Sequence, residues 1–213
     1  MATGARGRFI TLEGGEGAGK STQIKLLATW LRERGIDVVQ TREPGGAIGA
    51  ERIRALLVTG DADRWTPMAE TLLHYAARAD HLDRTIRPAL AARRWVICDR
   101  FADSTMAYQG YGHGVPFEVI ESLFKAVVGD SAPDLTVVLD LPVEQGLQRA
   151  AARAGPENRY EQMGVDFHNR LRSGFLAIAR QNPQRCAVID ADRDIDAIQS
   201  DIQAEVQRRL GLQ

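Results

Sequence analysis

The chain has 213 residues, and its 27 basic and 28 acidic side chains give a formal net charge of −1 at pH 7. This balance excludes the overall positive field of a dedicated nucleic-acid binder, and the 44% hydrophobic content excludes a disordered chain. The length is that of a single domain, so we expect one domain to span residues 1–213.

Arginine supplies nearly all of the positive charge, because Lys20, Lys25 and Lys125 are the only lysines. The planar guanidinium group suits phosphate and carboxylate partners, so the imbalance is consistent with phosphate chemistry. A bias toward arginine codons in a GC-rich genome explains it equally well.

Targeting and redox features are few. No run approaches the ~18 apolar residues of a membrane span, and the first ten residues lack the apolar stretch of a signal peptide. Cys98 and Cys186 lie far apart in short apolar runs, which is typical of buried, reduced thiols. We therefore expect a cytoplasmic protein with no membrane partner, in which residues 1–7 form a mobile arm.

Short apolar runs rich in β-branched or aromatic residues alternate with longer amphipathic stretches, a pattern that predicts a parallel sheet with crossover helices. We predict an α/β fold with a five-stranded parallel sheet. In chain order, the expected elements are a strand at 8–13, a helix at about 20–34, a strand at 37–42, helices at 48–58 and 66–92, a strand at 95–99, helices at 102–109 and 116–128, a strand at 135–141, helices at 143–153 and 161–181, a strand at 186–190 and a helix at 194–210.

The strongest motif lies between the first expected strand and the first expected helix. Residues 14–21 read Gly-Gly-Glu-Gly-Ala-Gly-Lys-Ser, a full match to G-x-x-x-x-G-K-[ST] in the strand–loop–helix context that this phosphate-binding loop requires. Lys20 is expected to reach the β- and γ-phosphates, and Ser21 to offer its hydroxyl to Mg²⁺. We expect ATP to bind the loop and the helix start, at Gly14, Gly15, Glu16, Gly17, Ala18, Gly19, Lys20, Ser21 and Thr22.

A nucleoside triphosphate site alone does not distinguish a switch, a motor and a transferase. The sequence contains no aspartate followed three residues later by glycine and no Asn-Lys-x-Asp, which argues against a GTPase switch. Helicases and transporters are usually larger or carry further motifs. A small-molecule kinase is the class that remains.

Two further motifs end predicted strands, at the sheet edge where open α/β folds bind ligands. Asp99 and Arg100 close the third strand, where the carboxylate suits Mg²⁺ or its waters and the guanidinium suits phosphate. A strand-end salt bridge is the alternative. Arg42 precedes a Glu-Pro-Gly-Gly turn, in which Pro44 restricts the backbone to an extended or turned form, with a cis bond as one option.

Together these strings resemble the thymidylate kinase family over nearly the whole chain. In family order they are Glu-Gly-x-Glu-Gly-x-Gly-Lys at 13–20, Thr-Arg-Glu-Pro-Gly-Gly at 41–46, Ala-Ala-Arg at 76–78 and Asp-Arg-Phe-x-x-Ser-x-x-Ala-Tyr-Gln at 99–109. The resemblance implies a P-loop NTPase fold with three layers, α/β/α, of the nucleoside monophosphate kinase kind. It also implies a homodimer that uses Mg²⁺ and transfers the γ-phosphoryl group of ATP to dTMP, giving dTDP and ADP in dTTP biosynthesis.

The resemblance further implies roles in binding dTMP. Glu16 would contact the 3′-hydroxyl, and Tyr108 would crowd the sugar's 2′ position and exclude a ribose hydroxyl. His74 occupies the position where the family usually has a phenylalanine that stacks on the base, and a neutral imidazole can still stack. Arg42 and Arg100 would bind the dTMP phosphate, and Arg78, Thr105 and Gln109 would read the thymine edge. Pro44 is a further expected contact of dTMP.

A turn-forming segment at 154–158 predicts a movable flap at about 149–160, although an ordinary surface loop is the alternative. The phosphate loop has Gly17 and no arginine after Glu16, so the sequence is similar to the bacterial subtype whose flap supplies the catalytic arginine. Arg153 is our first candidate and Arg159 the second, acting with Lys20 and Arg100, while Arg149 is expected to contact ATP. A kinase for another nucleoside monophosphate and a non-catalytic nucleotide-binding module remain alternatives.

Overall fold

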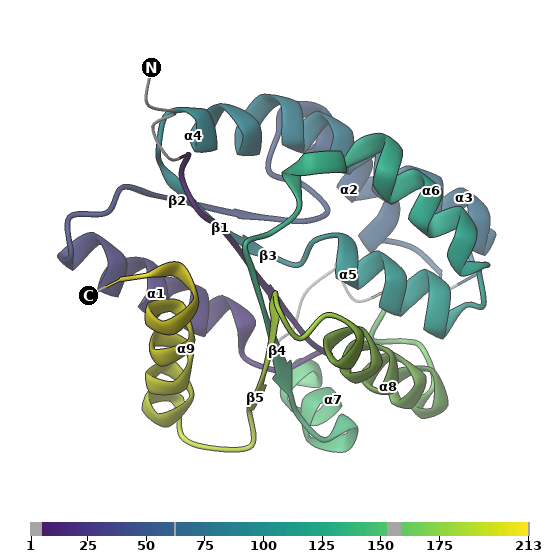
Figure 1. Ribbon diagram of the computed structural model, residues 1–213. Helices are drawn as coiled ribbons and strands as arrows, with labels where there is room; N and C mark the ends of the chain where they lie inside the picture. Colours follow the sequence, from purple (N-terminus) through teal and green to yellow (C-terminus); the bar gives the residue numbers. More distant parts are fainter. Residues whose placement is uncertain (1–5, 62, 153–158, 213) are drawn as a thin grey trace.

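The computed structural model describes residues 6–61, 63–152 and 159–212, which form a five-stranded parallel sheet between two layers of helices (Figure 1). This arrangement confirms the predicted α/β/α class. The strand order is β2-β3-β1-β4-β5, and each strand lies within one residue of its predicted bounds. The strands are β1 (Phe9–Glu13), β2 (Val38–Arg42), β3 (Trp95–Asp99), β4 (Leu135–Asp140) and β5 (Cys186–Asp190).

The central strand β1 is buried on both faces, as expected for a parallel sheet covered by helices. Ile10 and Leu12 pack against α1 (Lys20–Glu33) and α9 (Ile195–Leu210), which lie side by side on one face. Phe9 points to the opposite face and joins a second apolar cluster. The two-residue alternation of side chains along the strand therefore builds both layers of the core.

The remaining helices include those that carry the loops around the ligand-binding edge. On the face opposite α1 and α9, helices α3, α5, α6 and α8 contribute to the apolar clusters, and α2 packs beside α3. Their bounds are α2 (Ile48–Val58), α3 (Pro67–His81), α4 (Arg87–Ala91), α5 (Ala102–Thr105), α6 (Phe117–Val127), α7 (Val143–Ala151) and α8 (Val165–Gln181), with a 3₁₀ turn at Gly129–Ser131.

One predicted helix is divided. A π-helical turn, Leu82–Ile86, separates α3 from α4, although the sequence predicted one continuous helix. Pro88 has no N–H and cannot donate to the carbonyl of Arg84, four residues earlier. The N–H of Arg87 bonds to the carbonyl of Leu82, five residues earlier, so the helix widens by one residue just before the proline.

Two other helix predictions need correction. The helix that begins with α5 continues as a π-helical stretch, Met106–Gly112, which carries Tyr108 and Gln109. Such stretches are rare and often occur at functional sites. Helix α8 begins four residues later than predicted, because the residues before it form turns and Gly164 has an extended backbone.

The crossovers leave a crevice at one edge of the sheet. The chain leaves the carboxyl end of β1 toward the β2 side and leaves the neighbouring strand β3 toward the β4 side. Ligands bind at such switch points in open α/β sheets. The phosphate loop and Asp99 therefore lie where the topology favours a site.

Residues 1–5 of the predicted arm and 153–158 of the predicted flap lie outside the described residues. Arg6 pairs with Asp134 at 3.1 Å, and Gly7 donates its N–H to the carbonyl of Leu90. No helix within the described ranges has the length and apolar character needed to cross a membrane.

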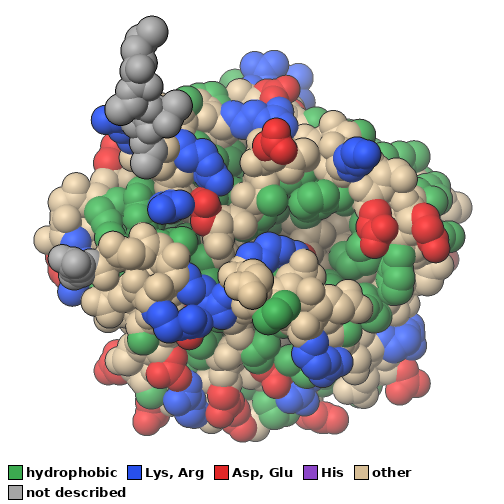
Figure 2. All heavy atoms as spheres, in the orientation of Figure 1, with side chains coloured by type: hydrophobic (Ala, Val, Ile, Leu, Met, Phe, Trp, Pro, Cys, Tyr) green, Lys and Arg blue, Asp and Glu red, His purple; other side chains and the backbone are tan. Residues whose placement is uncertain are grey.

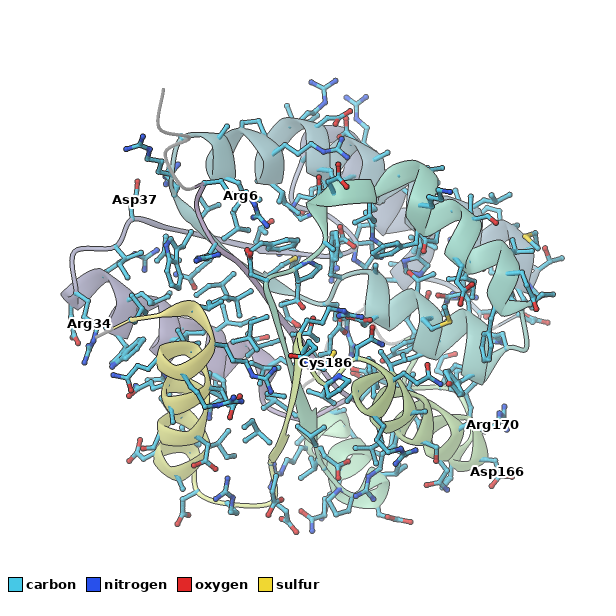
Figure 3. The ribbon with its side chains drawn as sticks, viewed as in Figure 1. Arg6, Arg34, Asp37, Asp166, Arg170 and Cys186 are labelled. Atoms are coloured by element: carbon cyan, nitrogen blue, oxygen red, sulfur yellow. The ribbon has the colours of Figure 1, made fainter. Side chains whose placement is uncertain are left out.

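The surface in Figure 2 carries charges of both signs, interspersed over the face in view. Figure 3 shows Arg34, Asp37 and Arg170 at the margin of the molecule and Cys186 inside it. Cys186 and Cys98 are both buried, free thiols.

Candidate active site

The phosphate loop joins β1 to α1 and approaches neighbouring backbone too closely for any side chain at two of its positions. A Cβ atom at Gly14 (φ +135°) would lie 2.4 Å from the carbonyl oxygen of Leu139, and one at Gly17 (φ +69°) only 2.0 Å from that of Gly146. Glycine is therefore required at both positions for steric and conformational reasons.

Lys20 is the first residue of α1 and folds back over the loop. Its Nζ donates to the carbonyls of Gly14 (3.1 Å) and Gly15 (2.8 Å). Burial, reinforced by the nearby positive charge of Arg100, lowers the pKa of Lys20 to about 8. An anionic phosphate beside Nζ would favour the protonated form, so the ammonium is suited to bind one.

Ser21 and Asp99 bring two oxygen groups together at the crevice, with Ser21 Oγ donating to Asp99 Oδ2 at 2.8 Å. Hydroxyl and carboxylate oxygens suit Mg²⁺, which usually takes its other ligands from phosphates and water. The described residues contain no group of three or more metal-binding His, Cys, Asp or Glu side chains. The pair fits an ion that reaches the site with a nucleotide.

Glu16, Arg100 and Tyr108 form a charged cluster beside the loop. Glu16 Oε1 accepts from Arg100 Nη2 at 2.9 Å and from the Tyr108 hydroxyl at 2.6 Å. Burial alone raises the pKa of Glu16, but the charges of Arg100 and Lys20 and the hydrogen bond from Tyr108 outweigh it and hold that pKa at about 2. Glu16 is therefore an ionised acceptor.

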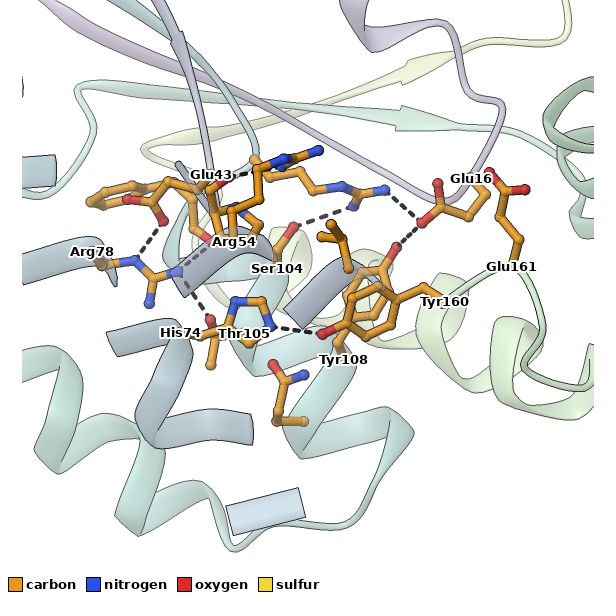
Figure 4. Close-up of a pocket in the computed structure, with 15 residues that line it drawn as sticks. Glu16, Glu43, Arg54, His74, Arg78, Ser104, Thr105, Tyr108, Tyr160 and Glu161 are labelled. Carbon is orange, nitrogen blue, oxygen red and sulfur yellow. Dashed lines mark hydrogen bonds and ion pairs between the residues drawn. The ribbon is translucent and has the colours of Figure 1, made fainter. Parts of the chain in front are cut away.

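A second site, which we call the substrate cavity, opens next to this cluster (Figure 4). Among the predicted residues that line it are Glu16, Pro44, His74, Arg78, Arg100, Thr105, Tyr108 and Gln109. Side chains from the phosphate loop, the turn after β2, α3 and the segment after β3 thus converge on one cavity.

Arg78 is buried at the wall of the substrate cavity and is held by neighbours on three sides. Its Nε donates to Glu43 (2.8 Å), and its Nη2 donates to Thr105 Oγ1 (3.0 Å) and the carbonyl of Phe101 (3.1 Å). Its Nη1 has no hydrogen-bond partner among the described residues. The sequence did not single out Glu43, which follows Arg42 in the predicted turn motif and fixes the guanidinium.

Gln109, at the same wall, has the complementary unpartnered atom. Its Nε2 donates to Glu70 Oε1 at 2.7 Å, while its Oε1 has no partner within the described part of the chain. Among the described residues, Arg78 therefore offers the substrate cavity an unpaired donor and Gln109 an unpaired acceptor.

His74 contacts the end of the predicted flap through Tyr160, which also lines the cavity. His74 Nε2 lies 2.8 Å from the Tyr160 hydroxyl, and the rings of Tyr160 and Tyr108 meet edge to face at 5.2 Å (Figure 4). Burial, with smaller effects from Arg78 and Arg159, lowers the pKa of His74 to about 3, so the imidazole is neutral. The sequence did not single out Tyr160, although an aromatic residue directly after Arg159 was a usable signal.

Arg42, the last residue of β2, and Arg54, within α2, lie on different sides of the expected site. Arg42 pairs with Glu51 at 3.1 Å, its side chain is 53% exposed, and it faces the groove of Ser21 and Asp99 rather than the substrate cavity. Arg54 lines the cavity and donates to the carbonyl of Pro44 at 2.8 Å. Arg54 therefore lines the cavity, whereas Arg42 lines the neighbouring groove.

The structure places two of the three arginines predicted for the flap, and they lie in different surroundings. Arg159 is 1% exposed and forms an ion pair with Glu70, and it also donates to the carbonyls of Leu57 (3.2 Å) and Asp61 (3.0 Å). Arg149 lines a hollow beside the phosphate loop with Thr22. Arg153 lies outside the described residues.

A phosphate-binding loop at the end of a central parallel strand, with a second cavity at the same edge, defines a P-loop kinase of small molecules. The family model for thymidylate kinase matches residues 12–202. The thymidylate kinase of Caulobacter vibrioides is 58% identical over 97% of this chain and 99% of its own length, and that of Jannaschia sp. is 52% identical over 95% and 97%. A crystal structure of thymidylate kinase from Ehrlichia chaffeensis superposes with a TM-score of 0.76 at 36% identity, over 95% of this chain and 99% of the other. The chain belongs to the thymidylate kinase family.

Proposed function

We propose that the substrate cavity binds dTMP and that the phosphate loop binds ATP, so that the two nucleotides meet at the crevice between β1 and β3. The chain is a dTMP kinase, a transferase that phosphorylates dTMP to dTDP in dTTP biosynthesis. The observation that carries the cavity assignment is that Arg78 and Gln109 line the same cavity, and that within the described residues Arg78 Nη1 is a buried donor and Gln109 Oε1 a buried acceptor without a partner.

These two atoms match the edge of thymine. Thymine presents the acceptor O4 next to the donor N3–H, whereas cytosine and adenine present an amino donor next to a ring-nitrogen acceptor. A buried polar group without a partner costs about 1–3 kcal/mol, so each correct contact removes a penalty and each wrong base retains it. Thymine satisfies both Arg78 Nη1 and Gln109 Oε1.

The rest of the cavity suits the sugar and phosphate. We assign Glu16 to the 3′-hydroxyl, because its carboxylate is ionised, and Tyr108 to the 2′ position of the sugar, because its hydroxyl is held against Glu16. Arg100 and Arg54 line the cavity and suit the dTMP phosphate. Arg42 is not part of this assignment, since it pairs with Glu51 outside the cavity.

Transfer of a phosphoryl group depends mainly on positioning and charge neutralisation. Lys20 would neutralise charge on the ATP phosphates from the loop, and Arg100 would do so from the dTMP side. Ser21 and Asp99 would hold Mg²⁺, which supplies further positive charge to the phosphate oxygens when bound. The hollow that Arg149 shares with Thr22 is available for the remainder of ATP.

We propose that the chain belongs to the subtype with a catalytic flap arginine. The steric limit at Gly17, next to the carbonyl of Gly146, leaves no room for an arginine at that position of the loop. Arg159 is already buried against Glu70. These two facts favour Arg153 as the arginine that reaches the transferred group.

The base assignment is tested with purified protein, ATP and a panel of monophosphates. We expect dTMP to be converted with a kcat/KM at least about 10²-fold above that of dCMP or dAMP, because the wrong bases leave both buried groups unpaired. Preference for dCMP or dAMP would overturn the assignment. Tight ATP binding without turnover of any monophosphate would instead indicate a non-catalytic module.

We also propose that the chain forms a homodimer through α2, α3 and α6. Helix α6 has only Ile120 fully buried and exposes Phe117 (41%). The neighbouring helices α2 and α3 expose Leu56 (38%) and Leu72 (50%). These helices pack next to one another on the side of the molecule away from α9 (Figure 1). Apolar side chains gathered in this way mark interaction surfaces.

The dimer is tested by measuring mass in solution. We expect twice the 23.4 kDa of one chain for the native protein, and a single-chain mass for Leu72→Arg, because a charge would have to be buried in the interface. Val188→Arg is the matched control, since Val188 is 47% exposed but lies on β5 at the edge of the sheet. A native protein of single-chain mass at micromolar concentration would contradict the proposal.

A further inference from the structure

Glu70 lies behind the wall of the substrate cavity and is not one of its lining residues. Its carboxylate is 1% exposed near the start of α3. Burying a carboxylate costs several kcal/mol unless a positive charge and hydrogen bonds compensate for it. Glu70 obtains both, from the guanidinium of Arg159 and from Gln109 Nε2 at 2.7 Å.

The carboxylate determines which way the Gln109 amide points. An ionised carboxylate can only accept hydrogen bonds, so Gln109 must turn its NH₂ group toward Glu70. The carbonyl Oε1 is then the end that remains for the cavity, and it is the atom without a partner in the described part of the chain. The oxygen and nitrogen of an amide are nearly equal in size, so a neutral neighbour that both donates and accepts would impose no such orientation.

Arg159 holds this carboxylate in place. Its guanidinium forms an ion pair with Glu70 and donates on its other side to the backbone carbonyls of Leu57 and Asp61. His113 Nε2 lies 3.8 Å from Glu70 Oε1, too far to replace Gln109 as a hydrogen-bond partner. Three segments distant in sequence therefore cooperate to fix one side-chain amide.

We propose that Glu70 is a positioning residue that sets base selectivity through Gln109. By holding the amide nitrogen, Glu70 presents Gln109 Oε1 to the cavity as an acceptor. That acceptor can bind the N3–H of thymine and repels the unprotonated N3 of cytosine. This inference rests on the proposed binding of dTMP in the same cavity.

The test compares two substrates that differ only at the edge in question. The monophosphates dTMP and 5-methyl-dCMP have the same size and the same methyl group, but the second has an amino group at C4 and no proton on N3. We expect Glu70→Gln to raise the ratio of kcat/KM for 5-methyl-dCMP to that for dTMP by about tenfold or more, because the amide of Gln109 can then adopt both orientations. Arg78 still opposes the amino group, so dTMP remains the better substrate.

A double-mutant comparison separates positioning from a general structural effect. Gln109→Ala removes the amide, so adding Glu70→Gln to it should leave the selectivity ratio unchanged. Glu70→Asp keeps the charge opposite Arg159 but shortens the reach to Gln109, and it provides the same test if Glu70→Gln does not fold. Thermal unfolding checks that each variant is folded.

The outcomes of these experiments distinguish the role of Glu70 from the proposed function, dTMP phosphorylation, on which it rests. A native protein that does not convert dTMP would refute the proposed function itself. A native protein that prefers dTMP, combined with an unchanged ratio in the Glu70 variants, would refute only the inference. A shift in the ratio that is equally large with and without Gln109 would also refute it, because Glu70 would then act by another route.

Discussion

We expect Lys20→Ala to lower kcat by roughly 10³-fold while the protein remains folded. The ammonium is the one lysine side chain at the phosphate loop, and removal of a single preorganised positive group at developing phosphate charge costs on that order. The folded state should tolerate the change, because it removes a buried charge together with two hydrogen bonds to Gly14 and Gly15. Steady-state kinetics and a thermal midpoint within ~2–4 °C of the native value would support the role.

Lys25→Ala is the matched control, since Lys25 is an exposed lysine on the same helix and should keep the native rate. A second readout is the pH profile of kcat/KM for ATP, which reports groups of the free enzyme. The pKa of Lys20 is about 8, so the loop loses its charge above that pH, and kcat/KM for ATP should fall there. Near-normal turnover of Lys20→Ala would remove the loop assignment.

Arg153→Ala should lower kcat by roughly 10²–10⁴-fold with little change in KM for dTMP, the pattern of an arginine that contacts only the transferred group. The substitution removes positive charge from the flap side of the transferred phosphoryl group. The phosphate loop cannot supply that charge instead, because it has no space for an arginine at Gly17. Single-turnover and steady-state kinetics with both substrates measure the effect. Arg54→Ala gives a useful contrast, since a residue of the dTMP end should mainly raise KM for dTMP.

Arg159→Ala should behave differently from Arg153→Ala. It would leave the buried charge of Glu70 unpaired, which costs about 3–5 kcal/mol and should lower the thermal midpoint markedly. If Arg159→Ala instead lost only kcat and kept its thermal stability, our ranking of the two arginines would be reversed.

Much of the fold was predictable because its signals are local. Each buried strand is a short run of β-branched and apolar residues, and the phosphate loop is defined by eight consecutive residues between a strand and a helix. The breaks inside helices were harder to predict from the sequence. The helical period of apolar residues continues through Leu82–Ile86 in the sequence. Only the structure shows that the helix accommodates Pro88 by a π-helical turn, in which the N–H of Arg87 bonds to the carbonyl of Leu82.

The site was predictable to the extent that motifs encode it. Arg78, Arg100, Tyr108 and Gln109 were named from strings at 76–78 and 99–109, and all of them line the substrate cavity. Arg42 and Arg54 could not be ranked in this way. Arg42 ends β2 and pairs with Glu51 outside the cavity, whereas Arg54 lies within α2 and lines the cavity.

The arginines also show which properties follow from the sequence and which follow from the tertiary structure. The sequence by itself determined the fold class, the phosphate loop and the family, because these depend on the order of residues along the chain. Only the tertiary structure decided what Arg159 and Gln109 do, because both depend on Glu70, whose side chain reaches them from another helix. The carboxylate of Glu70 forms an ion pair with Arg159 and fixes the orientation of the Gln109 amide. Because this partner comes from another part of the chain, it cannot be recognised until the chain is folded.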